Sequence, residues 1–232
     1  MATPYSPEVG STSGRVAARR AETRSEVLDH AEQIMVEDGA GAVTVAEIAR
    51  RMGMRSPSVY KYFPSLHAIY DALFARGNAR LNDCVADAVA DGDRGLDTLL
   101  AGARAYVHWI VTHPGPAALL IWRPIPGFAP SPESYAPARE MWQRTRDELT
   151  AAAGRGQLSA AADSDEAAGL LTSLVSGICS QQLANEPGAS FDTGRFTTLL
   201  DDALAMFVGH YATGPGRATS TEKTTSTEKT QP

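Results

Sequence analysis

Apolar residues recur three and four positions apart along most of the chain, a spacing that gives a helix one buried face. Two short stretches of this kind adjoin one another between residues 44 and 63. The first carries an apolar stripe made of Val45, Ile48, Ala49 and Met52. Gly53 follows at once, as a helix stop does, and Val59 and Phe63 then give the second stretch an inward face. The pattern predicts two short helices joined by a tight turn.

The ends of these helices are also encoded. Thr44 and Glu47 have the spacing of a capping box, in which each side chain satisfies an amide at the helix start. Ser56 is expected to cap the second helix, with Pro57 in its first turn, over a length of about two turns. The outer face then presents hydroxyls, phenols and cations, which suit phosphates and base edges of DNA. The predicted DNA-binding residues are Thr44, Arg55, Ser56, Pro57, Ser58, Tyr60, Lys61 and Tyr62. The alternative is a helical hairpin whose tyrosines pack on a neighbouring element.

The run AEIARRMGMRSPSVYKYFPSLHAIYDAL resembles the N-terminal domain of TetR/AcrR-type transcriptional regulators, over roughly residues 24 to 75. The positions that match the family pattern are Ala46, Ile48, Ala49, Gly53, Ser58, Tyr60, Tyr62 and Phe63. One position departs from it, because Leu66 stands where the family usually carries a lysine after Pro-Ser. The resemblance therefore leaves part of the expected phosphate contact to Lys61.

The remaining periodic stretches also predict helices, and no stretch alternates as a strand does. The expected further helices span residues 24–38, 66–89, 96–113, 117–122, 133–153, 165–185 and 191–211. We predict an all-α chain with a three-helix DNA-binding head over residues 23–67 and a helical bundle over residues 68–212. Residues 1–22 are predicted to form a flexible basic arm, and residues 213–232, which contain TSTEKT twice, a disordered tail.

Large aromatic residues gather in the middle of the distal part, beside a Pro-rich loop. They could line a cavity for an apolar or aromatic molecule, although aromatics at helical spacing can equally fill a core. The resemblance implies that this domain senses a small-molecule effector. The expected pocket residues are Tyr106, Trp109, His113, Trp122, Met141 and Trp142.

The last two expected helices suggest a dimer interface. One carries small residues that allow close approach, and the other carries a broad apolar stripe. The expected contact residues are Ser173, Ser176, Gly177, Leu200, Leu204 and Phe207. Equivalent helices pair in the family that the head resembles, and a dimer lets two recognition helices reach successive major grooves. The sequence therefore predicts a homodimer.

The formal net charge of −6 lies wholly outside the first 67 residues, whose acidic and basic side chains balance. Arg15, Arg19, Arg20 and Arg24 cluster before the first expected helix, so the arm could reach DNA backbone or minor groove, or else be a solvated tail. Because the head has no net positive charge, it is expected to bind DNA tightly only at a matching sequence.

Other chemistries find little support. The chain has two distant cysteines, no signal-peptide pattern, and His108 and His113 on different helix faces, so no metal, cofactor or catalytic residue is expected. The uncharged stretches at residues 105–122 and 167–185 contain histidines, prolines, serines and glutamines, which favour buried helices over membrane spans. We predict a cytoplasmic, DNA-binding repressor that a small molecule releases from a palindromic operator. The alternatives are a helical protein-interaction adaptor and a small-molecule enzyme in the bundle.

Overall fold

The computed structural model describes residues 10–213, and along these residues every regular element is helical. The main helices are α1 (Gly10–Asp38), α2 (Val45–Arg51), α3 (Ser56–Val59), α4 (Leu66–Ala88), α5 (Leu96–Thr112), α6 (Pro114–Ile121), α7 (Ala136–Gly154), α8 (Asp165–Asn185) and α9 (Leu200–His210). Short 3-10 turns lie at Ala40–Ala42, Ala160–Ala162 and Thr197–Leu199. The all-α prediction is confirmed. Within the described range, no helix combines the length and the apolar character that crossing a membrane requires.

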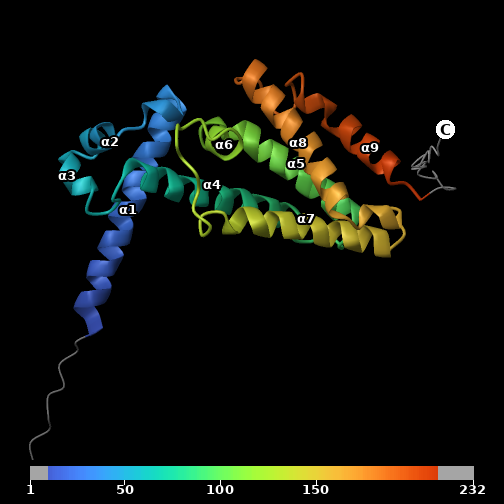
Figure 1. Cartoon of the computed structure of the whole chain (residues 1–232), viewed down its shortest axis with the longest axis horizontal. Helices are drawn as coiled ribbons and strands as arrows, with labels where there is room; N and C mark the ends of the chain where they lie inside the picture. Colours follow the sequence, from blue (N-terminus) through green and yellow to red (C-terminus); the bar gives the residue numbers. More distant parts are fainter. Residues whose placement is uncertain (1–9, 214–232) are drawn as a thin grey trace, which may run out of the picture.

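A small head forms around α1, α2, α3 and the first turns of α4 (Figure 1). The most deeply buried side chains of its core, at most 1% exposed, include Val27, Ile34, Ile48, Val59, Phe63 and Ile69. Tyr70 of α4 closes this core, and its hydroxyl donates a hydrogen bond to the Ala40 carbonyl at 2.7 Å. The head is therefore built around the start of α4.

The body is a bundle of α5, α7, α8, α9 and the later turns of α4. Figure 1 shows α4 leaving the head and running beside α7, with α5 and α8 above and α9 at the outer edge. Val107, Ile110, Leu149, Leu204 and Phe207 are almost fully buried in its core. Since α4 contributes to both cores, it is the mechanical link between head and body.

A cluster of ion pairs fixes α1 against α4. The Arg76 guanidinium lies 2.6 Å from Asp29 and 2.7 Å from Glu32, and Arg80 lies 2.9 Å from Glu32. The side chains of Arg76 and Glu32 are each only 16% exposed, so solvent screens this contact less than a surface pair.

The N-terminal segment differs from the prediction. Helix α1 begins at Gly10, so residues 10–22 are helical and the flexible arm is wrong over this range. Ala17, Ala18, Ala21 and the interspersed arginines are strong helix formers, and they extend the amphipathic helix backwards. The rest of the predicted arm, residues 1–9, and residues 214–232 of the predicted tail lie outside the described residues.

Two further helices are shorter than predicted. Helix α3 is a single turn, and the last helix begins at Leu200 rather than near residue 191. The buried Gln182 side chain explains the second difference, because its carbonyl oxygen accepts from the amides of Phe196 and Thr197 at 3.1 and 3.3 Å. These bonds fold the preceding segment into a turn against α8.

Candidate DNA-binding surface and effector cavity

The start of α2 is capped from one side only. The Thr44 hydroxyl accepts from the Glu47 amide at 3.1 Å, as predicted. The Glu47 carboxylate instead accepts from Arg50 at 2.6 and 2.7 Å and from Arg51 at 2.9 Å. Hydrogen bonds from Arg50 and then Arg51 lower the pKa of Glu47 to about 2. The reciprocal half of the capping box is therefore replaced by ion pairs that stay formed at neutral pH.

The turn between α2 and α3 depends on Gly53, whose φ of 65° lies in the left-handed region. The Met54 amide donates to the Ala49 carbonyl at 2.9 Å and the Gly53 amide to the Arg50 carbonyl at 3.2 Å, the pattern of a Schellman motif. Arg55, not Ser56, occupies the N-cap position of α3, and no side chain caps the helix. Pro57 lies in the first turn, as predicted.

Gly53→Ala is expected to destabilise the fold by about 1–2 kcal/mol, since a Cβ is unfavourable in the left-handed region. No neighbouring atom lies within 4 Å of the added Cβ, so the cost comes from the backbone alone. Gly53→Asn should lose less, because asparagine tolerates this conformation. Urea unfolding measures both, with Gly154→Ala, which adds an uncrowded Cβ at the end of helix α7, as the control. Equal loss in Gly53→Asn and Gly53→Ala would argue against this explanation.

Five of the eight predicted DNA-binding residues are exposed on the outer face of this unit. Thr44, Arg55, Pro57, Tyr60 and Lys61 are exposed, and Tyr60 is 51% exposed although it is a large aromatic residue. The other three, Ser56, Ser58 and Tyr62, are half-buried, and Tyr62 packs against the head core. Val59 and Phe63 are buried behind this face, and the Tyr60 phenol and the Lys61 ammonium face outward.

Helix α1 supports this surface from the side, a role that the sequence did not suggest. Arg20 donates to the Lys61 carbonyl at 3.1 Å, and Arg24 donates to the Tyr62 carbonyl. The Arg24 guanidinium also lies 4.1 Å from the centre of the Phe63 ring. These contacts fix the end of residues 56–63, the candidate recognition segment, so Arg20 and Arg24 position it.

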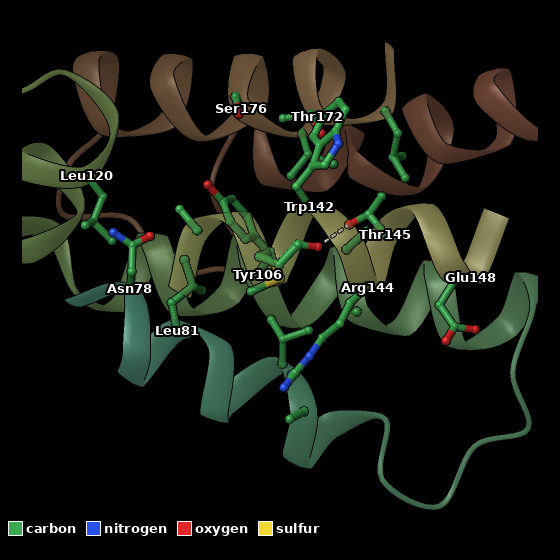
Figure 2. Close-up of a pocket in the computed structure, with 18 of the residues that line it drawn as sticks. Asn78, Leu81, Tyr106, Leu120, Trp142, Arg144, Thr145, Glu148, Thr172 and Ser176 are labelled. Atoms are coloured by element: carbon green, nitrogen blue, oxygen red, sulfur yellow. Dashed lines mark hydrogen bonds between the residues drawn. The ribbon is translucent and has the colours of Figure 1, made fainter. Parts of the chain in front are cut away.

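A cavity of about 400 Å³ opens in the body between α4, α5, α7 and α8 (Figure 2). Its wall is mainly apolar and includes Phe74, Leu81, Val85, Leu99, Ala103, Leu120, Leu171 and Val175. Figure 2 shows Asn78 and Leu120 at one end, Glu148 at the other, and Tyr106 between them. A volume of this size with few polar groups is typical of small-molecule sites. Among residues 10–213, no group of three or more histidine, cysteine or acidic side chains could hold a metal ion.

Three of the six predicted pocket residues line this cavity: Tyr106, Met141 and Trp142. The other three do not. Trp109 is 5% exposed in the body core and stacks on His113 at 4.6 Å, while Trp122 is 45% exposed at the end of α6. The lining residues that α4 and α8 contribute were not predicted from the sequence. Small residues such as Gly102, Ala103 and Ser176 leave the space open, but they give no periodic signal.

The Tyr106 phenol faces this space from α5. Burial raises its pKa to about 12; the nearby Cys179 thiol adds to the effect, and a hydrogen bond to Ser176 opposes it. Tyr106 is therefore a neutral hydroxyl at physiological pH, able to donate or accept a hydrogen bond.

The predicted dimer residues lie in three different places. Ser173 and Gly177 lie on the exposed face of α8, whereas Ser176 lines the cavity. Leu200, Leu204 and Phe207 are 1–2% exposed inside the protomer, so they cannot meet a partner. The stripe of α9 packs on its own bundle. The large apolar residues exposed on these two helices are Leu170 of α8 and Met206 of α9, and Leu199, which directly precedes α9, is also exposed.

The chain matches two descriptions of known families. Residues 27–73 match "Bacterial regulatory proteins, tetR family", and residues 99–204 match "Tetracyclin repressor-like, C-terminal domain". The first match covers the head from α1 into α4, and the second covers the bundle that contains the cavity.

Individual proteins agree with these matches. YobS of Bacillus subtilis, an uncharacterized HTH-type transcriptional regulator, is 35% identical over 100 residues, 42% of this chain and 52% of that protein. The HTH-type transcriptional regulator Rv1816 of Mycobacterium tuberculosis is 30% identical over 125 residues, 53% of each chain. The match thus spans about half the length of these relatives. The crystal structure of the transcriptional regulator FadR from Bacillus subtilis in complex with stearoyl-CoA has the same fold, with a TM-score of 0.64 and 14% identity over 79% of this chain and 97% of that one. Together, the matches to both domains show that this chain belongs to the TetR family of transcriptional regulators, which are not enzymes.

Proposed function

We propose that this protein is a cytoplasmic, dimeric repressor that holds a palindromic operator until a small molecule enters the body cavity. The effector need only bind more tightly to the arrangement that fits DNA poorly. A coupling free energy of about 1–3 kcal/mol would lower operator affinity roughly 5- to 150-fold. The adaptor and enzyme alternatives are set aside, because the chain is a TetR-family transcriptional regulator.

The observation that carries this proposal is the position of Phe74. This residue is 2% exposed, packs in the head core, and also lines the cavity. Leu120 of α6 packs against both cores and lines the same cavity. A molecule that displaces either side chain would therefore disturb the packing of the head directly. The FadR complex with stearoyl-CoA supports a small-molecule effector for a chain of this fold.

The loop from Arg123 to Tyr135 gives a second route between cavity and head. The Asp71 carboxylate of α4 accepts from the Ser131 amide at 2.7 Å and from the Ser131 and Ser134 hydroxyls at 2.9 and 2.8 Å. The ring centres of Phe128, in the loop, and Tyr70 lie 5.8 Å apart, and the Tyr70 hydroxyl donates to the Ala40 carbonyl in the head. We infer that Asp71 anchors this loop, so cavity and head respond together.

Asp71→Asn should lower the free energy of unfolding by about 1.5–3 kcal/mol, the usual contribution of hydrogen bonds to a charged group. Burial alone would raise the pKa of Asp71, but the bonds from Ser131 and Ser134 lower it overall. Their stabilisation is therefore complete above the ordinary value of about 3.9 and is lost as pH falls through the lower folded pKa.

Urea unfolding at pH 7 and at pH 3 tests this effect. The difference between wild type and Asp71→Asn should shrink at the lower pH. Asp83→Asn, an exposed aspartate on the same helix, is the matched control and should stay within about 0.5 kcal/mol of wild type. An equal loss in both variants at both pH values would count against the anchor.

We infer that two copies of the chain pair through the exposed face of α8 and α9. Leu170 and Leu199 are 37% and 50% exposed, and Met206 is 72% exposed. Ser173 and Gly177 lie on the same helix as Leu170, where small side chains permit close approach of a second copy. A two-fold axis through this face would present each such residue twice.

Selection of the purified protein on a random DNA library tests the function. We expect enrichment of an inverted repeat whose half-sites lie about one helical turn, roughly 34–36 Å, apart. Affinity for that sequence should fall steeply as salt concentration rises. Failure to enrich any sequence, with the protein folded and dimeric, would argue against the operator-binding proposal.

A further inference from the structure

The charged side chains around the cavity are unevenly paired. Three of the lining residues carry a charge: Arg123, Arg144 and Glu148. The Glu148 carboxylate is already engaged, since it accepts from Arg94 at 3.0 Å and from the Gly95 amide at 2.7 Å. None of the ion pairs formed within residues 10–213 involves Arg123 or Arg144. Arg123 and Arg144 are both exposed, so the cavity has a surplus of positive charge where its wall meets solvent.

Contacts with two aromatic residues orient the Arg123 side chain at the cavity wall. Its φ of 45° is the one positive value among the non-glycine residues that the structure describes, a conformation that costs energy for an arginine. The guanidinium lies 5.0 Å from the Tyr135 ring centre and 5.6 Å from that of Phe74, and it donates to the Tyr135 hydroxyl. Both rings belong to the cavity wall. A guanidinium has five N–H donors in a fixed plane, so most remain for another acceptor.

Arg144 is less firmly oriented than Arg123. It lines the wall from α7, and Figure 2 shows its side chain reaching across toward α4. No ring contact like those of Arg123 orients it among the described residues. Arg123 is thus the better organised of the two cations.

The cavity is long compared with its volume. Its lining follows α4 from Phe74 to Val89, about 22 Å at 1.5 Å per residue. Arg123, Phe74 and Tyr135 lie at the head end of this path, and the wall beyond them is mainly apolar. A molecule with a charged end and a long apolar body matches this distribution.

We propose that the cavity binds an elongated apolar carboxylate, with the carboxylate paired to Arg123 and the apolar body directed along α4. This inference rests on the proposed function, because it names the chemical class of the effector. Arginine pairs with carboxylates through two parallel hydrogen bonds, which fixes the headgroup as well as attracting it. Bound in this way, the headgroup lies beside the guanidinium that contacts Phe74 and Tyr135, two rings that pack in or against the head core.

Calorimetric titration of the full chain without DNA tests the class, with decanoate, decanol and decylamine as probes. These molecules share one chain and differ in headgroup charge. Decanoate should bind at least ten-fold more tightly than the other two, as expected for a hydrogen bond to a charged group. Decanol or decylamine binding as tightly as decanoate, or no binding of decanoate, would overturn the proposal.

Variants then test the residue. Arg123→Gln should weaken decanoate binding about ten- to one-hundred-fold and leave decanol binding unchanged, while Arg123→Lys should recover part of the affinity. Arg139→Gln removes the same charge from the exposed side of α7 and should change neither. A larger loss in Arg144→Gln than in Arg123→Gln would overturn the assignment to Arg123. Since these titrations contain no DNA, they can fail while the library selection succeeds, and the reverse.

Discussion

Tyr60→Ala is expected to weaken operator binding about 30-fold or more and to leave the fold and the dimer intact. The phenol is 51% exposed on the outer face of the recognition segment, so its removal creates no cavity in the head. A contact to a base edge or phosphate contributes about 1–3 kcal/mol, and a dimer makes that contact twice. The measurement is titration of the selected operator, with Tyr60→Phe separating the hydroxyl from the ring.

Lys61→Ala should act on the same surface in a different way. If its ammonium binds a phosphate, affinity falls about equally for matched and mismatched DNA, and the salt slope of a half-site drops by about one. Arg155→Ala, which removes an exposed cation at the far end of α7, controls for long-range charge effects. If Tyr60→Ala and Lys61→Ala bound the operator as wild type does, the assigned surface would be wrong.

The head could be predicted in detail because its signals are local. The cap at Thr44, the left-handed Gly53 and the inward pair Val59 and Phe63 each depend on residues a few positions apart. Even there, the sequence missed that Arg20 and Arg24 support the recognition segment, because that contact joins residues about forty positions apart.

The cavity could be placed only in the right domain. Tyr106 and Trp109 lie three residues apart on α5, yet one faces the cavity and the other fills the core. Which way each residue points depends on where α4, α7 and α8 pack, and apolar spacing does not encode that. The loop that carries Arg123 and Ser131 has no periodicity at all, so its contacts with α4 had no sequence signal.

The proposed dimer face shows the same limit. An apolar stripe on a terminal helix can pack on its own bundle or on a second copy, and for Leu204 and Phe207 the structure places the stripe inside. The exposed residues that remain, Leu199 and Met206, are too few to form a periodic pattern. They stand out only when burial is known.

Met206→Glu should raise the dimer dissociation constant at least one-hundred-fold. Met206 is 72% exposed in the protomer, so the change leaves the protomer stable, but a two-fold interface would bury two unpaired carboxylates. The penalty for burying a charge without a partner is several kcal/mol per ion, and each 1.4 kcal/mol is about ten-fold in affinity. Sedimentation across a range of concentrations measures the dissociation constant directly.

Operator affinity should fall when the dimer dissociates, because a single head contacts one half-site and loses the contribution of the second. Trp122→Glu is the matched control: Trp122 is a large apolar residue with 45% exposure that lies on neither α8 nor α9 and does not line the cavity. It should remain dimeric and bind the operator. A Met206→Glu protein that stays dimeric at nanomolar concentration would place the interface elsewhere. A monomer that still binds the inverted repeat as tightly as wild type would show that pairing through this face is not what sets operator affinity.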